Sequence, residues 1–274
     1  MGQYVEANGT RIWTESRGQG PDVLLIAGLS DPVEAWQAQL DGLSDRYRLI
    51  AFDNRGSGRT PLPGEPVSLA TMADDAAEVL RALGGDGTQA HVLGFSGGSA
   101  IAQELALRHP EAVRSLVLMS TWARADAYFA AMGRFWRWMA AEAPDERAML
   151  EAFFLWIYTP RAHADGTVQQ IVDEALAFPH PQSAEAFQRQ LETFTQHDTL
   201  DRLPAITAPT LVLAGERDIT TPPRFGRVVA DAIRGARFEV LEGEAHQPFQ
   251  ESPDMFNARV EAFWQEVESG TLPS

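Results

Sequence analysis

The sequence predicts a single α/β domain in which a mostly parallel sheet is flanked by helices and one helical segment is inserted between two strands. Strand and helix signals alternate along most of the chain, which is the pattern of a sheet built with crossover helices. One long stretch departs from this alternation and carries helical periodicity alone. A chain of 274 residues, of which 45% are hydrophobic, can bury one full core. One domain with an insert therefore fits better than two independent domains.

The strands are expected at short apolar runs. Asn8-Gly9-Thr10 predicts the turn between the first two strands. The later runs are apolar, and several are rich in β-branched residues, which favour strands. These later runs are Val23–Ile26, Leu49–Phe52, His91–Leu93, Leu116–Met119, Pro209–Gly215 and Arg237–Leu241.

The inserted stretch, residues 121–203, is predicted to be helical. Apolar residues recur there three and four positions apart, as on one face of a helix. Four prolines divide the stretch, which indicates about four helices. The predicted core is therefore residues 1–120 and 204–274. The periodic sets are Phe129, Met132, Trp136 and Met139, then Met149, Phe153 and Ile157, then Phe187, Leu191 and Phe194, and the prolines are Pro144, Pro160, Pro179 and Pro181.

A G-x-S-x-G motif, Gly94–Gly98, lies between the predicted strand His91–Leu93 and an apolar helical run. Glycines on both sides of Ser96 allow the tight strand-to-helix turn that exposes a serine hydroxyl. The alternative is a glycine-rich turn with an inert serine, and the pentapeptide alone does not separate the two. Ser96 is the candidate nucleophile, provided that the chain supplies a base and an acid.

Both partners are found where this motif requires them. A serine hydroxyl needs a base that takes its proton, and the base is usually a histidine oriented by a carboxylate. In this architecture, the acid and then the histidine follow later strands. Asp218 follows the strand that ends at Gly215, and His246 follows the last strand. Glu216 and Asp126 are the alternative acids, and Asp218 is the better candidate because it follows the penultimate strand.

The other five histidines are weaker candidates for the base. His91 opens a strand, His109 precedes a proline at a helix end, and His197 lies beside an aspartate before a loop. Each of these three is most simply structural. His163 and His180 lie in the inserted stretch, where they face either substrate or solvent.

These motifs make the chain resemble the α/β-hydrolase family over nearly its whole length. Besides Gly94–Gly98, the segment Asp53–Thr60 resembles the family's Asp-x-Arg-Gly-x-Gly segment, and His246–Pro253 matches the stretch after the catalytic histidine. Two departures stand out: Glu244-Ala245 replaces the common Gly-Gly before that histidine, and Ala27-Gly28 replaces a common His-Gly. The resemblance implies an eight-stranded, mostly parallel sheet with a helical cap formed by the inserted stretch.

The negative oxygen that forms when serine attacks a carbonyl needs two backbone N–H donors. One is expected from Gly97, at the start of the helix after the motif, where unpaired N–H groups favour an anion. The other is expected from Leu29, in the loop that follows the strand Val23–Ile26.

The resemblance implies a serine hydrolase that cleaves an ester or lactone through an acyl-enzyme, without a cofactor or a metal. Ser96 would attack, His246 would carry the proton and Asp218 would orient the histidine. A thioesterase, an aminopeptidase and a carbon–carbon bond hydrolase remain alternatives because the triad does not fix the leaving group. A ligand-sensing receptor on the same scaffold is the alternative from another class.

Aromatic residues are dense in the inserted stretch, and most are expected to pack its helices together. Some must line a cleft if the stretch covers the site, because ligand pockets are mainly apolar. Trp122, Trp136, Phe154 and Trp156 are the candidates for contact with a small to medium, mainly apolar, uncharged substrate.

Charge and composition restrict the partners. The formal net charge of −16 argues against nucleic acid and anionic membrane surfaces, and weakly favours a neutral or cationic substrate. The absence of cysteine excludes a disulfide framework and a zinc–cysteine site. No apolar stretch approaches the roughly 20 residues of a membrane span, and no signal peptide follows Met1. A cytoplasmic enzyme acting on a small molecule is the expectation, and the oligomeric state stays open.

Overall fold

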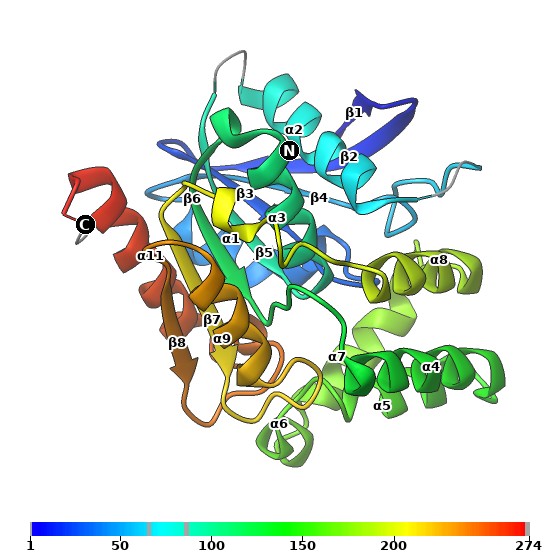
Figure 1. Ribbon diagram of the computed structural model, residues 1–274. Coiled ribbons are helices and arrows are strands. Elements are labelled where there is room, and N and C mark those ends of the chain that lie inside the picture. Colours follow the sequence, from blue (N-terminus) through cyan, green and yellow to red (C-terminus); the bar gives the residue numbers. More distant parts are fainter. Residues whose placement is uncertain (1, 65–66, 85–87, 272–274) are drawn as a thin grey trace.

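The computed structural model describes residues 2–64, 67–84 and 88–271 (Figure 1). Its centre is an eight-stranded sheet with the strand order β1-β2-β4-β3-β5-β6-β7-β8. The β1–β2 and β2–β4 pairs are antiparallel and all other pairs are parallel, as the sequence predicts. The strands are β1 (Gly2–Ala7), β2 (Thr10–Arg17), β3 (Asp22–Ile26), β4 (Arg48–Phe52), β5 (Ala90–Phe95), β6 (Val113–Met119), β7 (Thr210–Gly215) and β8 (Arg237–Leu241).

Helices cover both faces of this sheet (Figure 1). Alternate residues of the buried strands point to opposite faces, so Leu24 and Ile26 pack in one apolar cluster while Val23 and Leu25 pack in the other. The first cluster includes residues of α2, α3 and α9, and the second includes residues of α1 and α11. These helices are α1 (Gln37–Leu43), α2 (Leu69–Gly84), α3 (Gly97–Arg108), α9 (Pro223–Ala232) and α11 (Pro253–Ser269), with the short α10 (Pro248–Glu251) before α11.

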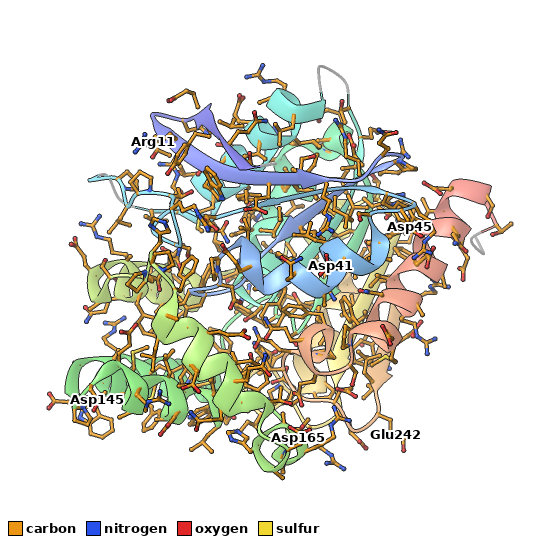
Figure 2. The ribbon with its side chains drawn as sticks, turned by 180° about the vertical axis from the view of Figure 1, so that it is seen from behind. Arg11, Asp41, Asp45, Asp145, Asp165 and Glu242 are labelled. Carbon is orange, nitrogen blue, oxygen red and sulfur yellow. The ribbon has the colours of Figure 1, made fainter. Side chains whose placement is uncertain are left out.

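The chain between β6 and β7 forms a helical insert, whose helices lie together at the lower right in the view of Figure 1. Seen from behind, Figure 2 shows Asp145 and Asp165 of this insert at its outer surface. One face of α4 packs inward: its residues Phe129, Met132, Trp136 and Met139 are all buried. The helices of the insert are α4 (Ala127–Glu142), α5 (Glu146–Phe154), α6 (Pro160–Ala164), α7 (Thr167–Ala177) and α8 (Ala184–Thr195).

The helical insert contains five helices rather than the predicted four. The stretch between Pro160 and Pro179 is divided by Gly166, whose φ of 88° is left-handed and interrupts the helix. Helix α5 also ends at Phe154, so the predicted partner Ile157 lies beyond it. Ile157 is still buried, in a small apolar cluster belonging to the insert. Apolar spacing thus located the buried residues without locating the helix end.

The described residues form neither a membrane-spanning helix nor a metal-binding cluster. Within ranges 2–64, 67–84 and 88–271, no helix is long and apolar enough to cross a membrane. The same ranges contain no group of three or more His, Asp or Glu side chains arranged to hold a metal ion.

Candidate active site

Ser96 lies in a sharp turn between β5 and α3. Its backbone angles, φ 50° and ψ −119°, are unusual for a residue with a side chain and cost on the order of 1–3 kcal/mol. Glycine makes the turn possible: a Cβ on Gly98 would lie 2.0 Å from the carbonyl oxygen of Ile26, and one on Gly94 would lie 2.5 Å from that of Gly98. Helix α3 therefore starts directly against the sheet, with the Ser96 side chain at its N-terminus.

Three side chains from distant parts of the chain form a continuous hydrogen-bonded series at this point. The Ser96 Oγ lies 3.0 Å from Nε2 of His246, and Nδ1 of His246 lies 2.8 Å from Oδ2 of Asp218. His246 is buried, with 2% of its surface exposed. If Nδ1 carries the ring proton and donates it to Asp218, Nε2 is free to accept the serine proton. The structure thus brings together the three residues that the sequence singled out.

Asp218 is held in its charged form by its neighbours. The N–H groups of Thr220 and Thr221 donate to its Oδ1, and the Thr221 hydroxyl donates to its Oδ2. Burial by itself raises the pKa of Asp218, but the His246 charge and these hydrogen bonds outweigh burial, so that its pKa lies below the ordinary value. An ionised Asp218 accepts the Nδ1 proton and fixes the tautomer of His246.

The alternative acids have other partners. Glu216 accepts a hydrogen bond from the Gly243 N–H, and Asp126 accepts one from the Phe129 N–H at the start of α4. The unusual Glu244, two residues before the histidine, accepts a hydrogen bond from the Ser252 hydroxyl.

The other histidines lie elsewhere. His91 bonds to Ser115, His109 to Asp74, and the buried His197 to Gln103. Burial lowers the pKa of His197 to about 4, so His197 is neutral at physiological pH. The remaining two, His163 and His180, are exposed on the helical insert.

The two residues expected to donate backbone N–H groups flank the nucleophile. Leu29 and Gly97 line the same pocket as Ser96. The loop that carries Leu29 is fixed to the segment after β4: the Asn54 side chain donates to the carbonyl of Ala27 (2.9 Å), and the Val33 N–H donates to Asp53 (2.8 Å). The family-like segment Asp53–Thr60 therefore supports this loop.

The pocket beside Ser96 is small and mainly apolar. Among the residues that the structure describes, none with a charged side chain lines it. Its free volume is about 20 Å³, enough for one water molecule and far below the roughly 300–1,000 Å³ of typical ligand sites. A substrate larger than this volume therefore needs a shift of the helical insert or of its lining side chains to enter. The lining residues are Leu29, Ser96, Gly97, Trp122, Phe129, Met132, Gly133, Trp136, Leu191, Phe194, Thr195 and Thr220.

The four aromatic candidates divide into two pairs. Trp122 and Trp136 line the pocket, whereas Phe154 and Trp156 do not. Phe154 packs edge-on against Tyr158, and Trp156 packs edge-on against Trp136. Phe154 and Trp156 therefore pack within the helical insert, although the Trp156 carbonyl accepts a hydrogen bond from Thr220, which lines the pocket. Helical periodicity did mark four lining residues that were not singled out for the site, Phe129, Met132, Leu191 and Phe194.

A second carboxyl group, Asp31, lies close to the site and was not predicted. Burial raises the pKa of Asp31 to about 7, while the His246 charge and hydrogen bonds from the Gly28 backbone and the Gln247 side chain oppose this rise. Asp31 therefore changes charge near neutral pH. The sequence held no signal for it, because its proximity to His246 joins loops more than two hundred positions apart.

The helical insert is bonded directly to the loops that carry the acid and the base. The backbone N–H of His246 donates to the carbonyl of Ile157 at 3.0 Å. The Thr220 hydroxyl donates to the carbonyl of Trp156 at 2.9 Å, beside Asp218. The segment between α5 and α6 is therefore a second anchor of the site.

The sheet order, the turn at Ser96 and the inserted helices define the class of protein. Residues 21–253 match the family model described as alpha/beta hydrolase fold, and the chain belongs to that family.

Similar proteins carry the names of several kinds of hydrolase. A protein of Azorhizobium caulinodans named "Putative carbamate hydrolase RutD" is 32% identical over 97% of this chain and 99% of its own length. The pimeloyl-acyl-carrier-protein methyl ester esterase of Aeromonas hydrophila is 29% identical over 92% of this chain and 98% of its own. The crystal structure of the enol-lactonase from Burkholderia xenovorans superposes with a TM-score of 0.85 and 26% identity, covering 96% of this chain and all of that one. The chain is thus an α/β hydrolase, and its relatives are named for hydrolysis of a carbamate, a methyl ester or an enol-lactone.

Proposed function

We propose that this protein is a serine hydrolase that cleaves an ester or lactone of a small to medium, uncharged, mainly apolar molecule. The observation that carries the proposal is the hydrogen-bonded series Ser96–His246–Asp218 beside an apolar pocket. Leu29 and Gly97 line the same pocket, and their backbone amides would supply the oxyanion site.

The reaction proceeds in two halves. His246 Nε2 takes the proton of Ser96 as Oγ bonds to the substrate carbonyl carbon, and the Leu29 and Gly97 amides bind the negative oxygen. Collapse of this intermediate breaks the bond to the alcohol oxygen, which receives the proton from His246. Water then attacks the acyl-enzyme and gives one proton to His246. The bond to Ser96 breaks, the acid leaves, and the proton returns to Ser96.

The pocket supports an uncharged acyl group. Trp122, Trp136 and Leu191 offer apolar surface, and no arginine lines the pocket to pair with an anion. An anionic group there would lose its hydration without gaining a partner, which is strongly unfavourable. A larger acyl group enters only when the helical insert or its lining side chains move, because the free volume is about 20 Å³.

The leaving group is less restricted than the acyl group. The relatives are named for a carbamate, a methyl ester and an enol-lactone. The same serine attack serves all three carbonyl groups, since fold and triad do not determine the leaving group.

Fluorophosphonate labelling followed by a substrate panel tests the proposal. The probe is expected to label wild-type protein on Ser96, and the Ser96→Ala variant should stay unlabelled. The panel contains acetyl, butyryl and octanoyl p-nitrophenyl esters, lactones, a carbamate, and a carboxylate-bearing ester of matched size. Labelling on another residue, or preference for the anionic ester, would contradict the proposed site. A single burst of one product per chain without turnover would instead indicate a receptor.

A further inference from the structure

A buried side-chain amide of the helical insert forms hydrogen bonds with the core near the site. The side chain of Gln190, on α8, is fully buried. Its Nε2 donates to the carbonyl of Arg55 (2.6 Å) and to the hydroxyl of Ser57 (3.0 Å). Its Oε1 accepts from the N–H of Ser30 (3.4 Å) and from Nε2 of Gln182 (2.9 Å). Every hydrogen-bonding position of the amide is used, so its orientation is fixed.

These bonds act on the residue next to an expected oxyanion donor. Ser30 follows Leu29 and has a φ of 69°, a left-handed conformation that a residue with a side chain rarely adopts. Such a conformation persists only where the surroundings impose it. Besides the bond to its N–H, the Ser30 hydroxyl donates to Oε1 of Gln182 at 2.5 Å. The two glutamines thus hold Ser30, whose N–H belongs to the peptide plane that directly follows Leu29.

The same helix contacts the other expected donor. The Phe194 ring of α8 lies against Gly97, where a Cβ would be 2.5 Å from it. Because Phe194 and Leu191 also line the small pocket, a substrate that enters must displace α8 or its side chains. Displacement of α8 breaks the bonds from Gln190 to Ser30 and Arg55.

We propose that Gln190 and Gln182 are positioning residues that align the Leu29 amide with the reacting carbonyl only when α8 is docked on the core. The proposal rests on the serine hydrolase function above and adds a coupling between closure of the helical insert and assembly of the oxyanion site. An open insert admits substrate with a relaxed loop, and a closed insert restores the donor geometry. The Gln190 and Gln182 side chains do not touch the substrate themselves.

The test compares Gln190→Leu with Gln188→Leu, the same change at an exposed position of α8. Gln190→Leu should lower kcat by about 10- to 100-fold, less than the loss of a whole oxyanion donor, with KM changed by less than about threefold. The rate of labelling by fluorophosphonate should fall in parallel, because the phosphonyl oxygen uses the same donors. Gln188→Leu should match wild type in both. A kcat of wild-type size in Gln190→Leu, or a loss confined to KM, would overturn the proposal.

Two milder variants cover the case in which Gln190→Leu fails to fold. Ser30→Ala and Gln182→Ala each remove the hydroxyl bond, and Gln182→Ala also removes a donor to Gln190. Each should lower kcat by about 3- to 10-fold with little change in KM. Unchanged kcat in both variants would also count against the proposal.

A measurement independent of turnover separates this proposal from the proposed function. Backbone amide exchange in the loop of residues 27–33 should be faster in Gln182→Ala and Gln190→Leu than in Gln188→Leu. If wild-type protein neither reacts with the probe nor hydrolyses any substrate, the proposed function fails. Faster amide exchange in residues 27–33 of the two glutamine variants would still show that Gln182 and Gln190 hold this loop. Equal exchange in all three variants would show that the glutamines do not hold the loop.

Discussion

The pocket beside Ser96 has one wall formed by the core, here the core wall, and one formed by the helical insert, here the insert wall. The two walls are built from different kinds of contact. On the core side, Ser96 is fixed by backbone packing so close that glycine is required at Gly94 and Gly98. On the insert side, the wall consists of side chains, such as the rings of Trp136 and Phe194, and the Gln190 amide bonds the same insert to the core. Backbone packing allows little adjustment, whereas side-chain packing can change with modest shifts of a helix. Reaction chemistry is therefore expected to depend on the core, and selectivity and access on the insert.

The largest effects should come from the core wall. Ser96→Ala and His246→Ala are each expected to lower kcat by about 10⁴- to 10⁶-fold. Both residues take part in the same step, the attack of the serine oxygen with transfer of its proton to the histidine. The double variant should lose little more than either one. Steady-state kinetics on the best ester of the panel measures this, and losses that multiply would show that the two residues do not act as one unit.

The acid should be nearly as sensitive. Asp218→Asn is expected to lower kcat by about 10⁴-fold, because an amide in this position favours the wrong tautomer of His246. Glu216→Gln is the matched control, since this carboxylate bonds only to the Gly243 N–H among the contacts described above. The two variants are compared by kcat with thermal melts alongside, and a greater loss in Glu216→Gln would move the acid to that position.

The insert wall should change selectivity more than rate. Trp136→Ala opens the pocket, so the ratio of kcat/KM for octanoyl over acetyl esters should rise by about 10- to 100-fold. Trp138→Ala is the control on the same helix, because its side chain is 60% exposed and lies outside the pocket lining. Trp136→Phe keeps more of the packing if the alanine variant is unstable. An unchanged ratio in both Trp136 variants would show that this ring only packs the insert.

The smallest effect concerns stability at the boundary between the two walls. Asp31 ionises near pH 4 when unfolded but near pH 7 when folded, so the folded state binds the extra proton between these values. Its contribution to stability is therefore full below about pH 4 and is lost as the pH rises through 7. Asp31→Asn should stabilise the protein more at pH 8 than at pH 5, by about 1–2 kcal/mol, because the side chain keeps some exposure. Urea unfolding at the two pH values measures this, and an equal effect at both would contradict the raised pKa.

The sequence predicted the core wall well because its signals are local. The turn at Gly94–Gly98, the apolar strands and the residues after β7 and β8 can each be recognised within a few positions. The insert wall was predicted less completely, as buried helix faces and four aromatic candidates, of which only Trp122 and Trp136 line the pocket. Spacing marked Leu191 and Phe194 as buried but did not give their partners, and no pattern distinguished Gln190 from the exposed Gln188. Its partners Ser30 and Arg55 lie more than one hundred positions away, so only the folded chain brings them together.

The bond from the His246 N–H to the carbonyl of Ile157 also sets a rule for building chimaeras. A designer who replaces the helical insert with that of a relative, in order to change the substrate, also removes the acceptor for the backbone of the histidine. The replacement then has a penalty that no substrate-contacting residue explains. A graft that keeps residues 156–159, and exchanges only helices on either side, leaves this acceptor in place. The crossover points of such chimaeras should therefore lie inside the helical insert, on either side of residues 156–159, rather than at the ends of the insert.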